Sequence, residues 1–540
     1  MSHARRSRGV ADRPMKAPRL LHDSLLAHGI AETCDRTAVV VDGQSYAFGQ
    51  LLDASQRLAG ALRSRGIGRG DRVAIQLENS WACATAVYGT LIAGGVFVLI
   101  NPQTKASKLA FILKDSGARA LIIESALEQV CREALRGLAK PPAVLCSGPC
   151  NGPAESLEAA LAAAQPLAEP ETVIPLDLAA IIYTSGSTGM PKGVMQTHQA
   201  MVFTTGSLIE YLRLTQDDRI LCVLPLSFDY GLYQLLMAVA LGACLVLERS
   251  FTFLGQVLGR LRDERPTVFP GVPTIFATLI AAHRRAALSF PSVTRITNTA
   301  AALPDEFAGE LREIFPNALI YRMYGLTECK RVSYLDPALI DSKPGSVGKA
   351  IPGTEVYLLS AEGSPVPPGE VGILHVRGPH VMAGYWNRPD LTHEMLKPGK
   401  LPGERVLCTH DLFRMDSEGY LYFVGRSDDI IKTRGEKVSP VEVENALHRI
   451  AGVREAAVFG VPDELLGQAI RAYVVADPTA GLTVQSLRAD SAAFLEPHMV
   501  PTQVILCDGL PRSPNGKVNK RQLMEDSSPA AKQNFGIRRE

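Results

Sequence analysis

Residues 183–194 hold the densest group of side chains that could bind a phosphate. Between positions 183 and 193 stand four serine or threonine hydroxyls, three glycines and Lys192. Glycines let backbone N–H groups approach a ligand, successive N–H groups form an anion-binding concavity, and hydroxyls and an ammonium add donors and charge. This chemistry suits a nucleoside triphosphate, although the spacing of a Walker A loop is absent. The apolar run at 178–182 predicts a buried strand leading into the loop, which favours a ligand site over a flexible Gly/Ser linker.

Four later stretches also carry charged or hydroxyl side chains among turn residues. The first of them, residues 324–328, directly follows a predicted strand, and ligands bind at the carboxyl ends of strands in open α/β sheets. Taken alone, each of the others has a plain structural interpretation as a turn, a solvated linker or an exposed surface loop. They are residues 408–412, 425–440 and 511–518.

Together the five stretches resemble, in order and spacing, the signature motifs of the adenylate-forming superfamily. That superfamily includes acyl-CoA synthetases, the adenylation domains of peptide synthetases, and luciferases. The resemblance spans about residues 20–523 and implies ATP and Mg²⁺ as cofactors, with CoA or a phosphopantetheine arm as acceptor. It assigns the phosphates to Thr184, Ser185, Gly186, Ser187, Thr188, Gly189 and Lys192.

The stretch at 324–328 is similar to the second nucleotide signature of the superfamily. By that resemblance Tyr324, beside Gly325, stacks on adenine, and Thr327 holds the α-phosphate. Glu328 matches the Mg²⁺ ligand, and a single glutamate is enough because magnesium takes one or two carboxylates together with phosphate oxygens. Ala301 stands where the superfamily usually has a Gly-rich adenine contact.

The ribose is expected at the third stretch. Asp411 matches the carboxylate that holds both ribose hydroxyls, and an acceptor-only group suits two donors. His410 replaces a glycine of the superfamily pattern, so the local loop geometry is in question. Arg426, at the start of the fourth stretch, matches a residue that reaches the ribose.

The remaining resemblances concern a change of domain pose. Asp428 matches the hinge pivot, and Gly435 matches the glycine that approaches the thiol tunnel in the second pose. Lys517 matches the lysine that enters the active site during adenylation. A long point charge suits that role, because it can offset charge growing on an α-phosphoryl transition state.

Residues 226–233 are expected to line the acid pocket, because they follow the strand predicted at 220–224. The pair Phe228-Asp229 resembles the Phe-Asp motif of amino-acid adenylation domains, where the aspartate binds the substrate ammonium; Tyr230 is taken as a second pocket residue. A substrate ammonium would provide the partner that a buried carboxylate needs. The alternative is that Asp229 caps the helix that follows. Residues 228–232 also resemble acyl-CoA ligases associated with exosortase systems, a weaker likeness.

Strands and helices alternate along most of the chain, which predicts parallel βαβ units. The expected fold class is α/β, with a large N-terminal domain of βαβ layers, a β subdomain at about 354–423, and a small mobile α+β C-terminal domain. The expected divisions are a disordered tail (1–19), an AMP-binding domain (20–425), a lid domain (426–526) and a second tail (527–540). Residues 147–176 show little periodicity and are expected to form a connecting excursion.

The amino-acid composition indicates which kinds of partner and which cellular compartment to expect. Lys+Arg number 56 and Asp+Glu 55, so nucleic acid is not an expected partner. Ten cysteines are thinly spread and the one close pair, Cys146 and Cys150, has no second pair nearby, so reduced thiols in the cytoplasm are expected rather than a zinc site. Residues 81–100 carry no charge, but Gly94 and Gly95 interrupt them, so a helix, a turn and a strand are predicted there instead of a membrane span.

These observations predict an AMP-forming acid–thiol ligase. ATP would activate a carboxylic acid, with an amino acid as the candidate substrate, to an acyl-adenylate, and a thiol of CoA or of an acyl carrier protein would then take the acyl group. A luciferase-like oxidase and a fatty acyl-AMP ligase share the same motifs and remain alternatives. A non-catalytic nucleotide-binding protein would be expected to have lost Lys517 or Glu328, and both are present.

Overall fold

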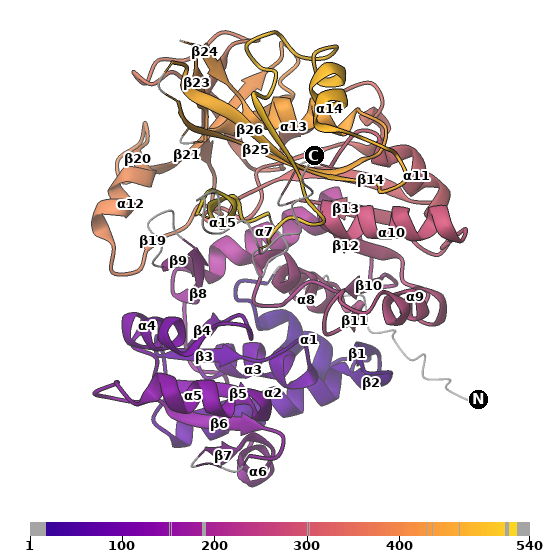
Figure 1. Cartoon of the computed structure of the whole chain (residues 1–540). Helices are drawn as coiled ribbons and strands as arrows, with labels where there is room; N and C mark the ends of the chain where they lie inside the picture. The colour runs from indigo at the N-terminus through magenta and orange to yellow at the C-terminus, as the bar shows by residue number, and fades with distance from the viewer. Residues whose placement is uncertain are drawn as a thin grey trace, which may run out of the picture.

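The fold is described here from a computed structural model. It describes residues 18–150, 152, 154–185, 191–299, 301, 303–427, 429–434, 436–463, 465–512 and 518–525. Three β-sheets organise this part of the chain. In Figure 1 the first sheet and its helices lie at one end of the molecule, in indigo and purple, and the last sheet lies at the other, in orange and yellow.

The first sheet is buried on both faces. Its strand order is β19-β9-β8-β4-β3-β5-β6-β7, and the pairs from β8 through β4 to β7 are parallel. Adjacent residues of β4 and β5 point into two different apolar cores. Phe97 and Ile122 belong to one core, and Val98 and Leu121 belong to the other. Such near-continuous apolar strands are typical of parallel sheets covered by helices on both sides. The elements are α1 (Asp23–Ile30), α2 (Phe48–Ser64), β3 (Arg72–Gln76), α3 (Trp81–Ile92), β4 (Val96–Leu99), α4 (Ala106–Ser116), β5 (Ala120–Glu124), α5 (Glu128–Leu135), β6 (Ala143–Ser147), β7 (Glu155–Ser156), α6 (Leu157–Ala163), β8 (Leu178–Ser185), β9 (Pro191–Thr197) and β19 (Gly384–Tyr385).

The second sheet is longer and joins a parallel part to an antiparallel part. Its order is β17-β18-β21-β22-β16-β15-β14-β13-β12-β10-β11-β1-β2, with β20 on β21. The strands from β14 through β10 to β1 are parallel, and those from β15 to β18 form the antiparallel part predicted as a β subdomain. The elements are β1 (Thr37–Val41), β2 (Gln44–Ala47), α7 (His198–Tyr211), β10 (Arg219–Cys222), α8 (Asp229–Leu241), β11 (Cys244–Leu247), α9 (Leu254–Asp263), β12 (Val268–Gly271), α10 (Pro273–Arg285), β13 (Arg295–Asn298), α11 (Phe307–Ile314), β14 (Leu319–Tyr324), β15 (Ser333–Leu335), β16 (Ser346–Ala350), β17 (Glu355–Leu359), β18 (Val371–Arg377), α12 (Pro389–Met395), β20 (Leu396–Pro398), β21 (Arg405–Met415) and β22 (Leu421–Arg426).

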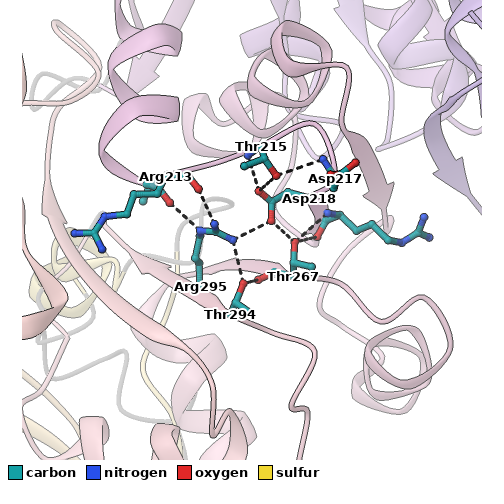
Figure 2. A network of polar contacts seen from close by, with 9 residues as sticks. Arg213, Thr215, Asp217, Asp218, Thr267, Thr294 and Arg295 are labelled. Carbon is teal, nitrogen blue, oxygen red and sulfur yellow. Dashed lines mark hydrogen bonds and ion pairs between the residues drawn. The ribbon is translucent and has the colours of Figure 1, made fainter. Parts of the chain in front are cut away.

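The amino ends of β10, β12 and β13 are tied together by a polar network, which Figure 2 shows. Asp218 is 5% exposed, and its Oδ1 lies 2.9 Å from Arg295 Nη1 and accepts from Thr267 Oγ1 at 2.7 Å. Its Oδ2 accepts from the Thr215 N–H at 2.7 Å. Buried ions with partners of this kind hold strand starts in register, so this end of the sheet is structural and the carboxyl end is left for ligands.

A third sheet forms the C-terminal unit. Its core contains only residues from Ile431 onward, and its order is β24-β23-β26-β25 with β27 on β26. The division into two domains near residue 426 stays a prediction. The separate apolar cores agree with it, but they do not show that the two parts fold or move independently. The elements are β23 (Ile431–Thr433), β24 (Glu436–Val438), α13 (Pro440–His448), β25 (Val453–Asp463), β26 (Gly467–Ala476), α14 (Val484–Ser491), β27 (Gln503–Leu506) and α15 (Lys520–Glu525).

The predicted fold class is confirmed, and the uncharged stretch at 81–100 is α3, a turn at Gly94 with φ 78°, and β4. Within the described residues no helix has the length and apolarity to span a bilayer. The sequence reading missed α5 and α9, and it expected no regular structure where β7 and α6 lie.

The expectation of fully reduced thiols is wrong for one pair. Cys146 and Cys150 form a disulfide, with Cα atoms 6.4 Å apart. Gly148, at φ 86°, lets the chain turn between them. The other eight cysteines are free.

Candidate active site

A cavity of about 1080 Å³ opens at the carboxyl ends of β13 and β14. The parallel strands β10, β13 and β14 end at the same edge, so the loops after them meet there. The hairpin β8–β9 and the paired strands β21 and β22 complete the wall, together with α13 of the C-terminal unit. The cavity gathers ten of the predicted site residues: Thr184, Lys192, Asp229, Ala301, Tyr324, Gly325, Thr327, Glu328, Asp411 and Arg426.

Of the other predicted residues, only Tyr230 has a described side chain, and it does not line this wall. Tyr230 is buried behind it, where its hydroxyl donates to Thr297 O at 2.7 Å. Ser185 ends β8, but its side chain is outside the described part. Gly186, Ser187, Thr188, Gly189, Asp428, Gly435 and Lys517 lie outside the described residues, so their roles stay predictions.

Lys192 and Glu328 are brought together by Tyr385, a residue that the sequence reading missed. The Tyr385 hydroxyl donates to Glu328 Oε1 at 2.5 Å, and Lys192 Nζ lies 4.9 Å from the centre of the same ring. Burial and the adjacent Glu328 carboxylate raise the pKa of Tyr385, so it remains a donor at neutral pH. An ammonium over the ring and a carboxylate held by its hydroxyl suit a triphosphate and its metal.

The proposed metal is Mg²⁺, and the residues present fit it. Glu328 and Thr327 line the cavity, and one carboxylate is enough for an ion held mainly by phosphate oxygens and water. Within the described residues there is no group of three or more His, Cys, Asp or Glu that could hold a metal by itself. The donor set therefore suits a metal that arrives with the nucleotide.

The turn that carries Thr327 and Glu328 is tightly packed. A Cβ at Gly325 would lie 2.1 Å from Lys330 O, so only glycine fits there. Gln196 donates to Thr327 O at 2.9 Å and anchors the turn to β9. The turn ends with Lys330 at φ 61°, a left-handed conformation that costs energy for a long side chain.

The predicted ribose site has its acidic group in place. The Tyr324 hydroxyl donates to the Asp411 carboxylate, and Arg426 Nε lies 3.5 Å from Asp411 Oδ1. Burial, together with the Asp411 charge, raises the pKa of Tyr324 well above its ordinary value. His410 has φ 56°, so it adopts the left-handed backbone that favours the glycine it replaces. The residue that stands in place of glycine therefore adopts a backbone conformation that glycine adopts readily.

The acid side of the cavity is more polar than its sequence suggested. Asp229 is the first residue of α8, follows the N-cap Phe228 and makes no capping hydrogen bond. Its Oδ1 lies 3.6 Å from Lys330 Nζ, and both side chains are buried. Lys330 also lies over the rings of Tyr230 and Tyr233, at 5.3 and 5.0 Å. The carboxylate thus already has a partner in the chain, which neither interpretation of Asp229 foresaw.

Two neighbouring strands bring further polar groups to this side. Asn298 ends β13, and it lines the cavity with Thr299. Thr299 Oγ1 accepts from Arg331 Nη1 at 2.6 Å, and Arg331 is 1% exposed. Lys330 and Arg331 follow the motif at 324–328 after one residue, Cys329. Two adjacent cations there were the available signal, but their burial could not be predicted from sequence.

Helix α13 covers part of the cavity from the C-terminal unit. Asn445 and His448 line the wall, and Arg449 stacks on Phe494 at 4.6 Å. Residues from both major parts of the chain therefore enclose one cavity. A hairpin predicted to bind phosphate, a carboxylate predicted to hold ribose, a polar pocket beside them and a C-terminal unit that covers the cavity together indicate a nucleotide-dependent acid-activating enzyme.

The comparisons with known proteins agree with this class. The chain belongs to the AMP-binding enzyme family, whose model matches residues 26–386, and the model of the AMP-binding enzyme C-terminal domain matches residues 442–517. A long-chain-fatty-acid–CoA ligase of Bacillus subtilis (strain 168) is 30% identical over 535 residues, covering 94% of each chain. Bacitracin synthase 3 of Bacillus licheniformis is 30% identical over 504 residues, which cover 92% of this chain and 8% of the synthase. The crystal structure of the anthranilate CoA ligase AuaEII in complex with anthranoyl-AMP has a TM-score of 0.87 and 26% identity, and covers 95% of this chain and 98% of that one.

These matches confirm the adenylate-forming superfamily and the enzyme class, an ATP-dependent, AMP-forming acid–thiol ligase. The narrower likeness to exosortase-associated ligases stays a prediction.

Proposed function

We propose that the cavity binds ATP·Mg²⁺ and a carboxylic acid together and joins them as an acyl-adenylate. The observation that carries this is the placement of Lys192, Glu328 and Asp411 around one cavity whose other side holds Asp229. Phosphates would lie near Lys192, ribose at Asp411, and the acid between Tyr324 and Asp229. The nucleotide signature and the acid pocket thus face each other across the reacting atoms.

The first step is an in-line displacement. A carboxylate oxygen of the acid attacks the α-phosphorus, the bond to the bridging oxygen breaks, and pyrophosphate leaves. The protein supplies position and charge rather than covalent chemistry. Thr184 and Thr327 would donate to phosphate oxygens, and Lys192 would offset their charge. Mg²⁺, when bound at Glu328, neutralises further phosphate charge.

The second step passes the acyl group to a thiol. We propose that the C-terminal unit turns about Asp428, withdraws Lys517 and admits the thiol beside Gly435. A bond forms between the thiolate sulfur and the acyl carbonyl carbon as the bond from that carbon to AMP breaks, and AMP leaves. Relatives of both kinds match the chain, a CoA ligase and a carrier-dependent synthase, so CoA and a carrier-protein phosphopantetheine are both proposed acceptors.

The direct test is ATP–pyrophosphate exchange across fatty, aryl and amino acids, followed by mass analysis after CoA or a phosphopantetheinyl carrier is added. We expect exchange with at least one acid and a thioester afterwards. Glu328→Gln should abolish the exchange, because the proposed metal ligand loses its charge. Exchange without any thioester would favour an acyl-AMP ligase, and oxygen uptake with light would favour the oxidase.

Asp229 supports an amino-bearing acid as the substrate. A substrate ammonium could share the Asp229 carboxylate with Lys330, which lies 3.6 Å away. An amino acid and its des-amino analogue should be compared in wild type and Asp229→Ala. Loss of an ionic partner should cost roughly 2–5 kcal/mol of discrimination. A wild-type preference for the des-amino acid would contradict this reading of Asp229.

A further inference from the structure

A fully buried guanidinium lies directly behind the acid side of the cavity. Arg331 is 1% exposed and donates from Nη1 to Thr299 Oγ1 at 2.6 Å. Its Nε has no hydrogen-bond partner in the part of the chain that the structure describes, and no carboxylate there forms an ion pair with it. The ring of Tyr230 lies 5.7 Å from Arg331 Cζ. A buried charge of this kind is costly until an anion balances it.

A second unsatisfied group lines the cavity itself. Asn298 is 2% exposed, and its Nδ2 finds no partner among the described residues. It is adjacent to Thr299, the residue that accepts from Arg331. A buried amide donor without a partner costs free energy that a ligand acceptor would recover. Both unsatisfied donors would therefore be satisfied by an oxygen acceptor, and the charge of Arg331 favours an acceptor that is negatively charged.

The Asp229 carboxylate lines the same cavity and would repel an anion if it stood alone. Lys330 Nζ lies 3.6 Å from its Oδ1, with both side chains less than a tenth exposed. This internal pair offsets the Asp229 charge. Of the three adjacent charged groups, Arg331 is thus the one whose charge is not balanced within the set.

We propose that the activated acid carries a second carboxylate, which binds at Asn298 and Thr299 and is balanced in charge by Arg331. The proposal rests on the proposed function and names the class of its acid. A plain fatty or aryl acid would leave Asn298 and Arg331 unpaired, and sites with buried polar groups discriminate strongly against ligands that cannot satisfy them. Arg331 reaches the cavity through Thr299, so it is a positioning and charge-balancing residue.

The experiment uses acids matched in carbon number that differ only in polar groups. One series is butanoate, 2-aminobutanoate, succinate and aspartate; the other is hexanoate, 2-aminohexanoate, adipate and 2-aminoadipate. kcat/KM of ATP–pyrophosphate exchange is measured for each with the full chain. We expect the acids with a second carboxylate to exceed their counterparts by roughly ten- to hundredfold, the value of a hydrogen bond to a charged group.

Variants separate recognition from folding. Asn298→Ala removes an amide donor that has no partner in the described chain, so Tm should stay unchanged while the dicarboxylate preference falls by roughly tenfold or more. Arg331→Met should remove the preference and keep or raise Tm, because a buried unpaired charge is replaced by an apolar chain of similar length. Arg331→Lys should restore part of the preference. The matched control is Arg295→Met, which removes a partly buried cation at the opposite end of β13 (Figure 2) and should lower Tm without changing the preference.

Several results would overturn the proposal. Equal or better exchange with the monocarboxylates would do so while leaving the acid-activating function intact. An unchanged preference in both Asn298→Ala and Arg331→Met would show that the groups serve only the fold. Activity confined to acids that lack a second carboxylate, inside or outside the two series, would reject the second carboxylate, and the absence of exchange with any acid would reject the proposed function as well.

Discussion

Tyr385→Phe tests whether the link between Lys192 and Glu328 orients the metal ligand. The change deletes the hydroxyl that donates to Glu328 Oε1 at 2.5 Å and keeps the ring that lies 4.9 Å from Lys192 Nζ. A hydrogen bond to a charged group contributes about 1.5–3 kcal/mol. Tyr385 is 2% exposed, so water cannot easily replace the lost donor.

We therefore expect the rate of ATP–pyrophosphate exchange to fall by roughly ten- to hundredfold at low Mg²⁺. The defect should shrink as Mg²⁺ is raised, because metal binding can reorient the freed Glu328. The assay is exchange rate against Mg²⁺ concentration at fixed ATP. Tyr385→Leu, which also removes the ring over which Lys192 lies, should be worse at every concentration.

The matched control is Tyr321→Phe. Tyr321 is fully buried on β14, and its hydroxyl has no partner in the described chain, so its loss should be neutral for exchange. If Tyr385→Phe and Tyr321→Phe had the same exchange rate at every Mg²⁺ concentration, the proposed role of the Tyr385 hydroxyl would be refuted.

Four further predictions follow from the site and its surroundings. Lys517→Ala should cut adenylate formation by several orders of magnitude and spare thioester formation from pre-made acyl-AMP; an equal fall in both half-reactions would reject the two poses. Asp428→Pro fixes φ near −65° at the proposed pivot, so exchange should persist while thioester formation drops, and normal turnover would place the pivot elsewhere. His410→Gly should raise Tm, by relieving a left-handed φ of 56°, with the KM for ATP little changed; a lower Tm would show that the ring itself stabilises the loop. Burial lowers the pKa of His22 and of His198 from 6.5 to about 4, so the unfolded chain binds more protons than the folded chain between these pH values. The contribution of each histidine to the free energy of unfolding, measured by urea titrations, should be complete above pH 6.5 and fall by about 1.4 kcal/mol per pH unit toward pH 4. A flat profile would contradict the burial of these histidines as neutral rings.

The nucleotide side of the site was predictable because its chemistry is local. The turn at 324–328 and the hairpin β8–β9 each carry their predicted ligand groups within a few residues; the strands that lead into them were predicted at 319–322 and 178–182, whereas β9 was not. His410 could not be interpreted from sequence, since only the structure shows that it adopts the left-handed φ that favours glycine.

The acid side was not predictable, because its decisive contacts are tertiary. Asp229 and Lys330 are a hundred positions apart and meet only when β10 and β14 end at the same edge of the sheet. Tyr385 reaches Glu328 because β19 pairs with β9, an antiparallel contact between distant segments. The disulfide of Cys146 and Cys150 depends on a glycine turn whose geometry a short spacing does not determine.

The pairing of β21 with β22 has a consequence for how the two half-reactions share one intermediate. Asp411 lies opposite Arg426 in this ladder, and Arg426 is the last residue of β22 before the proposed pivot. The same sheet continues through β16 and β15 to β14, which carries Tyr324. The described residues predicted to contact the adenosine therefore lie in or next to strands of one sheet, and the proposed lid begins just beyond the last of them. In the proposed two-pose mechanism, the adenylate would stay on this sheet while the lid changes which groups face its carbonyl, first the lysine and then the thiol.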